Sequence, residues 1–104
     1  MTLPTSFVLV NRKWKVKFVS ERQLMQITGE NKKIWGCCSE LDATIYLNDE
    51  LRQHDPELLY HTFEHELIHA QLMAHGIVDH DECFVDGMAG IRRQYLKTMR
   101  GNLE

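Results

Sequence analysis

The stretch PELLYHTFEHELIHAQLMAHG, residues Pro56–Gly76, has the pattern of one long helix on which the fold of this chain depends. Proline suits a first helical turn, Asp55 is a candidate N-cap before it, and glycine is a good C-terminal stop. At 100° per residue, two arcs are expected, one apolar and one polar. The apolar arc of about 60° holds Phe63, Leu67, Ala70 and Ala74, and the polar arc holds Glu64, Gln71 and His75. We therefore expect most of this helix to be buried.

The centre of this helix carries the motif H-E-x-x-H, formed by His65, Glu66 and His69. Residues i and i+4 of a helix lie about 40° apart and one turn apart, so both imidazoles can reach one metal ion. Glu66 is rotated by 100° from His65, which lets its carboxylate flank the open side of the metal and accept a proton from water. The six histidines and nine glutamates of the chain predict only about 0.03 such motifs by chance.

A zinc site needs a third protein ligand, and three downstream residues are candidates. Glu82 begins the pattern Glu82-x-x-x-Asp86, which on a helix places both acids on one face. Glu82 would then bind the metal, while Asp86 orients a ligand histidine through its ring N–H. Glu82 could instead close a capping box with Asp79, and His80 and His75 are the other two candidates.

The segment before this helix is strand-rich. Its expected elements are strands at 7–10, 13–19, 34–38 and 43–47, a helix at about 20–28, and a loop at 48–55. Ser20 is a candidate N-cap with Gln23 as its capping-box partner, and Gly29 is a stop. A last helix is expected from about 79–82 to about 100. Its apolar arc comprises Phe84, Val85, Met88, Ala89, Ile91, Tyr95, Leu96 and Met99. The order β-β-α-β-β-α-α predicts one α+β domain over residues 1–104, with a small antiparallel-rich sheet at its N-terminal end.

Composition narrows the classes of function. The chain has 104 residues, is 43% hydrophobic and 26% charged, and has a net charge of −3. The acidic balance argues against a nucleic-acid partner, and the three lysines Lys13, Lys15 and Lys17 are expected to form a solvated strand face. No apolar run approaches the roughly 20 residues that cross a bilayer. Three cysteines, two of them adjacent, form a poor disulfide framework, so we expect a reducing, cytoplasmic setting.

The motif His65–His69, followed by Glu82-x-x-x-Asp86, resembles a much-shortened gluzincin, a zinc peptidase with a glutamate helix after its active-site helix. More closely, residues 43–99 resemble small H-E-x-x-H metallopeptidase-like proteins that are common in bacteriophages and bacteria. This resemblance implies a minimal zincin-like fold, with Zn²⁺ held by His65, His69 and Glu82, and Glu66 as the general base. It also implies a peptide or protein substrate, such as a host or phage protein, in the host cytoplasm if the chain is phage-encoded.

A rival resemblance uses His80 as the third ligand. The run His80-x-x-x-Phe84-x-x-x-Met88 resembles the third-ligand segment of SprT-like metalloproteases, which act on proteins attached to DNA. Asp81 stands where that family usually has glycine, and the zinc-binding tail of the family is absent. This alternative implies a DNA-associated substrate.

The expected reaction is hydrolysis of a peptide bond. Zinc would polarise the scissile carbonyl and lower the pKa of its water, while Glu66 would move the proton to the leaving amine. The substrate would pair with an edge strand, for which 43–47 is the candidate, and His61 or Tyr60 could donate to the oxyanion. A competing hypothesis from another class is a non-catalytic, zinc-stabilised module that binds another protein.

Overall fold

The computed structural model of the chain describes residues 3–53, 56–77 and 81–103, and it confirms the α+β class and the expected order of elements. Where a loop was expected after the last strand, residues 49–53 form a short 3₁₀ helix. The strands are β1 (Ser6–Leu9), β2 (Arg12–Val19), β3 (Gly36–Ser39) and β4 (Thr44–Asn48). The helices are α1 (Glu21–Thr28), η1 (Asp49–Gln53), α2 (Pro56–Ala74) and α3 (Glu82–Leu103).

The four strands form one mixed sheet in the order β1-β2-β4-β3. β1 and β2 pair antiparallel, as do β3 and β4, whereas β2 and β4 are parallel. The prediction that residues 43–47 form an edge strand is therefore wrong. β4 lies inside the sheet, because the chain passes from β2 through α1 and β3 before it returns as the parallel neighbour of β2. The edge strand on this side is β3.

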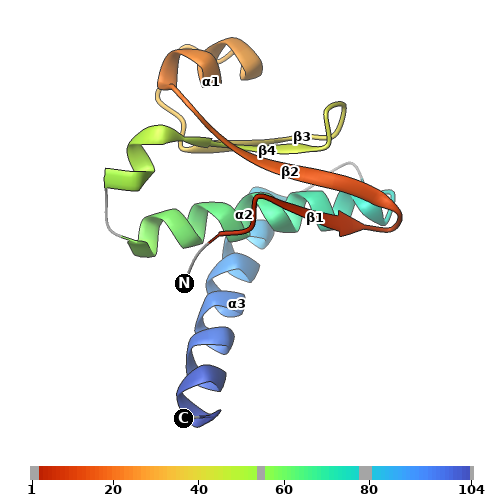
Figure 1. The fold of residues 1–104 in the computed structure, drawn as a ribbon, viewed down its shortest axis with the longest axis vertical. Coiled ribbons are helices and arrows are strands. Elements are labelled where there is room, and N and C mark those ends of the chain that lie inside the picture. Colours follow the sequence, from red (N-terminus) through yellow and green to blue (C-terminus); the bar gives the residue numbers. More distant parts are fainter. Residues whose placement is uncertain (1–2, 54–55, 78–80, 104) are drawn as a thin grey trace.

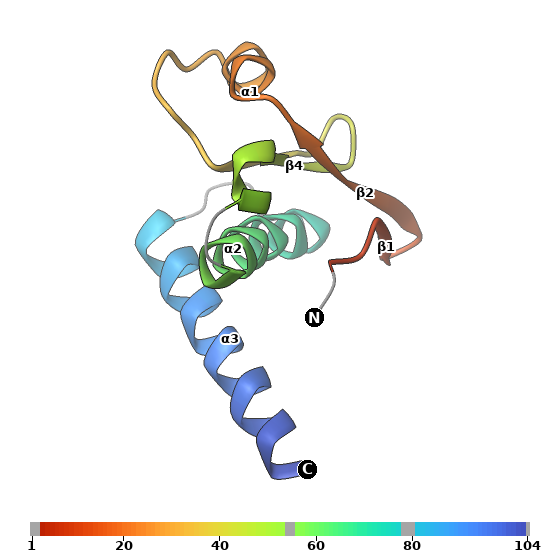
Figure 2. The same ribbon diagram turned by 60° about the vertical axis from the view of Figure 1, so that its left-hand side comes forward.

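The elements are arranged in layers around this sheet (Figures 1 and 2). α1 lies on one side of the sheet, α2 runs along the other side, and α3 leaves the body at an angle to α2. The largest core cluster lies between sheet and α2, where Ile45 and Leu47 pack with Leu51 and Phe63. A second cluster holds Trp14. No helix among the described residues is both long and apolar enough to cross a membrane.

Local signals place the helix ends. The Ser20 side chain accepts from the Gln23 backbone N–H, and the Gln23 side chain accepts from the Ser20 N–H, which confirms the capping box. Gly29 ends α1 at φ 74°, a left-handed conformation that favours glycine. At the end of α2, the N–H of Gly76 donates to Met73 and that of Ile77 to Leu72, a Schellman pattern. The candidate N-cap Asp55 lies outside the described residues.

Two predicted helix faces differ from the structure. Glu64, expected on a polar arc, is buried because Arg92 of α3 covers it, with 3.2 Å between Arg92 Nε and Glu64 Oε2. The apolar arc of α3 is only partly covered. Val85 and Ala89 are buried against Ile68 of α2, whereas several large side chains of the same arc remain exposed. They are Phe84, Ile91, Tyr95 and Met99.

Candidate metal centre

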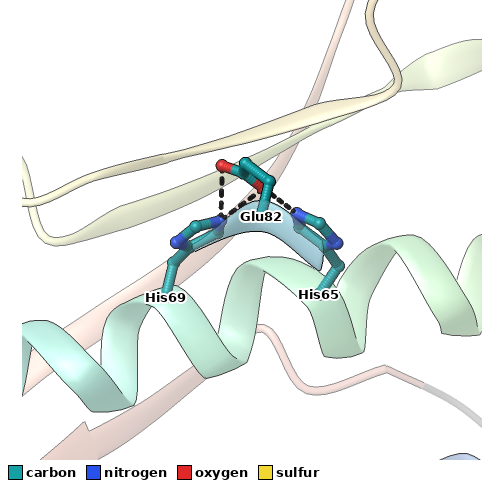
Figure 3. A group of neighbouring side chains, drawn as sticks. All are labelled: His65, His69 and Glu82. Carbon is teal, nitrogen blue, oxygen red and sulfur yellow. Dashed lines mark hydrogen bonds and ion pairs between the residues drawn. The ribbon is translucent and has the colours of Figure 1, made fainter. Parts of the chain in front are cut away.

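Helix α2 presents His65 and His69 on one face, one turn apart, as the spacing predicts. Figure 3 shows both rings turned toward the carboxylate of Glu82, below the strands of the sheet. The ring centroids lie 5.0 Å apart and the ring planes are tilted by 60°. His69 is buried, and His65 is partly buried. The helix therefore directs both imidazoles toward one point, where they can bind the same metal ion.

Glu82 reaches this pair from the first turn of α3. Its Oε2 lies 2.9 Å from Nε2 of His65, and its Oε1 lies 3.2 Å from Nε2 of His69. The side chain of Asp81 accepts from the N–H groups of Cys83 and Phe84, so Asp81 acts as the N-cap of α3. The competing capping role of Glu82 involves Asp79, which lies outside the described residues.

The donor set suits a zinc ion. One ligand atom from each of His65, His69 and Glu82 lies within 4.8 Å of the others, the only such group among the residues described. Ligands at 2.0–2.1 Å from a tetrahedral ion are separated by about 3.3–3.4 Å. Oε2 of Glu82 lies 2.9 Å from Nε2 of His65 and 3.3 Å from Nε2 of His69, so these nitrogen-to-oxygen distances need to open by only a few tenths of an ångström. Two imidazoles and one carboxylate also match the ligands of catalytic zinc.

Asp86 lies one turn after Glu82 and contacts two histidines of α2. Its Oδ1 lies 3.2 Å from Nδ1 of His65 and 2.7 Å from Nε2 of His61. Hydrogen bonds from His61 and then His65 lower the pKa of Asp86 below its usual value. When Nδ1 of His65 donates its hydrogen bond to a carboxylate, Nε2 keeps its lone pair and can bind a metal ion. This is the orienting role that the sequence predicts for Asp86.

His61 is accordingly a partner of Asp86 in this structure, a contact that the sequence reasoning missed. The signal that could have found it is the i, i+4 spacing of His61 and His65, which places both rings on the same face of α2.

Glu66 is buried beside the two histidines, with 8% of its surface exposed. Burial raises its pKa to about 7; the smaller effects are that of His65, which lowers the pKa, and that of Glu82, which raises it. The Glu66 carboxyl lines a cavity of about 360 Å³. The three candidate metal ligands line the same cavity, and its remaining walls are formed by Cys37, Cys38 and Met73. A group with this pKa can accept and release a proton near neutral pH.

The edge strand β3 forms one wall of this cavity through Cys37 and Cys38. A second cavity of about 240 Å³ continues under the start of the same strand and is lined by Trp35, Gly36, His61 and Asp86, among others. Since His65 and Glu66 line both cavities, they lie at the centre of a cleft that follows β3. Burial raises the pKa of the Cys37 thiol to about 11, so this side chain is protonated near neutral pH.

The structure does not bring every candidate to this centre. Tyr60 lines a different cavity, with Glu64 and Arg93, on another side of α2. His75 is exposed near the end of α2 and lines a cavity on the side of Leu72 and Phe84. His80, and with it the third-ligand position of the SprT-like alternative, lies outside the described residues.

No protein-family model, curated protein or solved structure matches this chain.

Proposed function

We propose that this protein is a zinc-dependent peptidase of minimal zincin-like architecture, with His65, His69 and Glu82 as metal ligands. The observation that carries the proposal is the buried carboxyl of Glu66 beside a complete set of three zinc donors. A structural zinc site has four protein ligands and no need of an adjacent base, whereas a catalytic site has three and an open position. When bound, zinc supplies Lewis acidity, which activates water and polarises a carbonyl.

The chain's own residues then have distinct roles. Oε of Glu66 accepts the proton of the attacking water and passes it to the nitrogen of the leaving amine. In the metal-free chain, burial raises the pKa of this carboxyl to about 7, which makes it a stronger base than an exposed glutamate. Asp86 holds Nδ1 of His65, so that Nε2 faces the metal position.

The substrate would lie extended along β3. Among the described strands, β3 pairs only with β4, which leaves its other edge open to a peptide backbone. The cleft under β3 has Glu66 near its centre, so a peptide that extends the sheet would cross the site with its scissile bond near this carboxyl. This arrangement supports a protein substrate with an exposed, flexible segment.

The test compares Glu66→Gln with Glu64→Gln, because both residues are buried glutamates of α2 and only Glu66 lines the cleft. Each protein is loaded with Zn²⁺, its metal content is measured by mass spectrometry, and cleavage of a degenerate peptide library is followed. We expect one zinc per chain in the wild-type protein and in both variants. Glu66→Gln should lose at least about 100-fold in turnover, whereas Glu64→Gln retains it.

Two results would contradict the proposal: a wild-type chain without stoichiometric zinc, or a Glu66→Gln variant that cleaves like wild type. Stoichiometric zinc without any cleavage would favour the other class of function, a zinc-stabilised module that binds a protein.

A further inference from the structure

Helix α3 carries an exposed apolar stripe that the fold of one chain leaves uncovered. Phe84, Ile91 and Tyr95 are 55%, 60% and 61% exposed, and Met88 and Met99 belong to the same row. At 100° per residue, these five side chains lie within an arc of about 80°. The centre of this arc lies about 100° around α3 from the direction of Val85 and Ala89, which are buried against Ile68 of α2, so the stripe runs beside the helix contact.

The first half of this stripe borders a groove. A cavity of about 460 Å³ lies between α3, the second half of α2 and the turn between β1 and β2. Its walls are mainly apolar and include Leu9, Val10, Ile68, Leu72, Phe84 and Met88. Because Phe84 and Met88 belong to both stripe and groove, the two form one continuous surface. Figures 1 and 2 show that the second half of α3 extends beyond the body of the molecule. Tyr95 and Met99 belong to this half by their position in the sequence.

We infer that this surface pairs with the same surface of a second copy, with the two α3 helices antiparallel. The midpoint of the stripe falls at Ile91. A two-fold axis at Ile91 lays the protruding half of each α3 over the groove of the other copy. The protruding half of one chain thus fills the groove of the other chain, and the reverse contact is identical. Such mutual fit of one patch with itself is the requirement of an isologous dimer.

Gly87 supports this arrangement. It lies inside α3, and a Cβ added there would meet nothing within 4 Å, so packing within one chain does not require glycine. Glycine in a helix interior costs about 1 kcal/mol relative to alanine. The two-fold axis at Ile91 places Gly87 opposite Tyr95 of the second copy, where the missing side chain makes room for the ring.

Charge and area also favour a second copy. Along the exposed side of the stripe stand the uncharged Gly87, Gln94 and Thr98, while Arg92 on the other side is already paired with Glu64. The surface therefore meets itself without like-charge repulsion.

At roughly 200 Å² per large side chain, the exposed parts of Phe84, Ile91, Tyr95 and Met99 amount to about 400 Å² of apolar surface. A standard interface buries about 800 Å² per partner, of which roughly 450–500 Å² is apolar. The exposed Val10 and the groove walls supply the remainder.

The first experiment measures the oligomeric state by sedimentation velocity between 5 and 200 μM. We expect a wild-type dimer, and a monomer for Ile91→Glu. The control is Leu41→Glu, since Leu41 is an apolar residue that is even more exposed (91%, against 60% for Ile91) and lies between β3 and β4, away from α3. Gly87→Ala should weaken the dimer at least tenfold, whereas Gly90→Ala, also a helical glycine with open space but on another side of α3, should not. Circular dichroism verifies that each variant is folded.

The second experiment tests the orientation by disulfide trapping. Ile91→Cys, on the axis, should give a covalent dimer under mild oxidation, whereas Thr98→Cys should not, because 14 residues of helix separate its two copies by about 21 Å. A wild-type chain that is monomeric at 200 μM, an Ile91→Glu variant as dimeric as wild type, or efficient trapping through Thr98→Cys would overturn the inference. The pairing does not depend on the metal centre, so zinc content and cleavage report separately on the proposed function.

Discussion

Glu66 is the residue whose chemistry the fold changes most. A carboxyl on a helix surface would ionise near its ordinary pKa of 4.5, but here burial under the sheet raises the pKa to about 7. The neighbouring Glu64 is also buried, but it faces Arg92 of α3 rather than the cleft. Two glutamates two positions apart on one helix thus have different surroundings, and only one of them is available for proton transfer in the cleft.

The raised pKa of Glu66 predicts a pH-dependent stability of the metal-free protein. Between about pH 4.5 and 7 the folded chain binds a proton that the unfolded chain has released, so the free energy of unfolding falls as pH rises through this window. Glutamine does not titrate, so Glu66→Gln removes this fall in the free energy of unfolding. Its stability relative to wild type should therefore increase with pH and level off above pH 7, with a pH-dependent gain of about 3 kcal/mol.

Urea unfolding in the presence of a chelator, at several pH values from 4.5 to 8, measures this difference. Glu64→Gln is the control for replacement of a buried glutamate on the same helix. A constant offset between Glu66→Gln and wild type over the whole range would contradict the prediction.

At the scale of elements, the position of the edge strand β3 over α2 depends on Gly36. A Cβ added at this position would lie 3.1 Å from Cγ2 of Thr62 and 3.1 Å from the backbone oxygen of Tyr46. Glycine therefore lets β3 approach both α2 and β4 closely. Gly36 lines the cavity beside His61 and His65, so this close approach positions the cleft wall at that end.

Gly36→Ala is expected to destabilise the chain by about 1–3 kcal/mol, because the added methyl group overpacks the contact with Thr62. Thr62→Ser removes the methyl group nearest to it and should restore part of the loss in the double variant, measured as a coupling energy in denaturant unfolding. Gly90→Ala adds the same methyl group in open space and should stabilise the helix by about 0.5–1 kcal/mol. A neutral Gly36→Ala variant would show that β3 can move away from α2 without cost.

At the scale of the whole molecule, the candidate metal site joins two helices that otherwise meet along a limited apolar contact. His65 and His69 come from α2, Glu82 comes from α3, and the buried apolar residues between these helices are Ile68, Val85 and Ala89. Ion pairs reinforce the contact at Glu57 with Arg93 and at Glu64 with Arg92. A metal ion that binds both helices would thus stabilise the arrangement that forms the cleft.

Zinc at 100 times its Kd should stabilise the chain by about 2.7 kcal/mol, which for about 100 residues raises the Tm by roughly 10–20 °C. His69→Ala should abolish this rise. His75→Ala, which removes an exposed histidine of the same chain outside the cleft, should retain it. Thermal unfolding with zinc and with chelator measures both, and an equal rise in the two variants would contradict the assignment of His69 as a ligand.

Much of the secondary structure was predictable because its signals are local. The capping box of Ser20 and Gln23 starts α1, Gly76 ends the long helix, and period-two alternation marks β2. The meeting of His65 and His69 also follows from helix geometry alone. These features depend on residues within one or two turns of each other, so the order of neighbours along the chain is enough to specify them.

The α+β class, the order of elements and the paired histidines could thus be read from the order of residues alone. Three features required the packed chain: β3 rather than β4 forms the edge of the cleft, Glu82 and Asp86 reach His65, and half of the apolar arc of α3 stays exposed. Strand order and the partners of an apolar face depend on packing between residues distant in sequence, and local periodicity does not encode that packing.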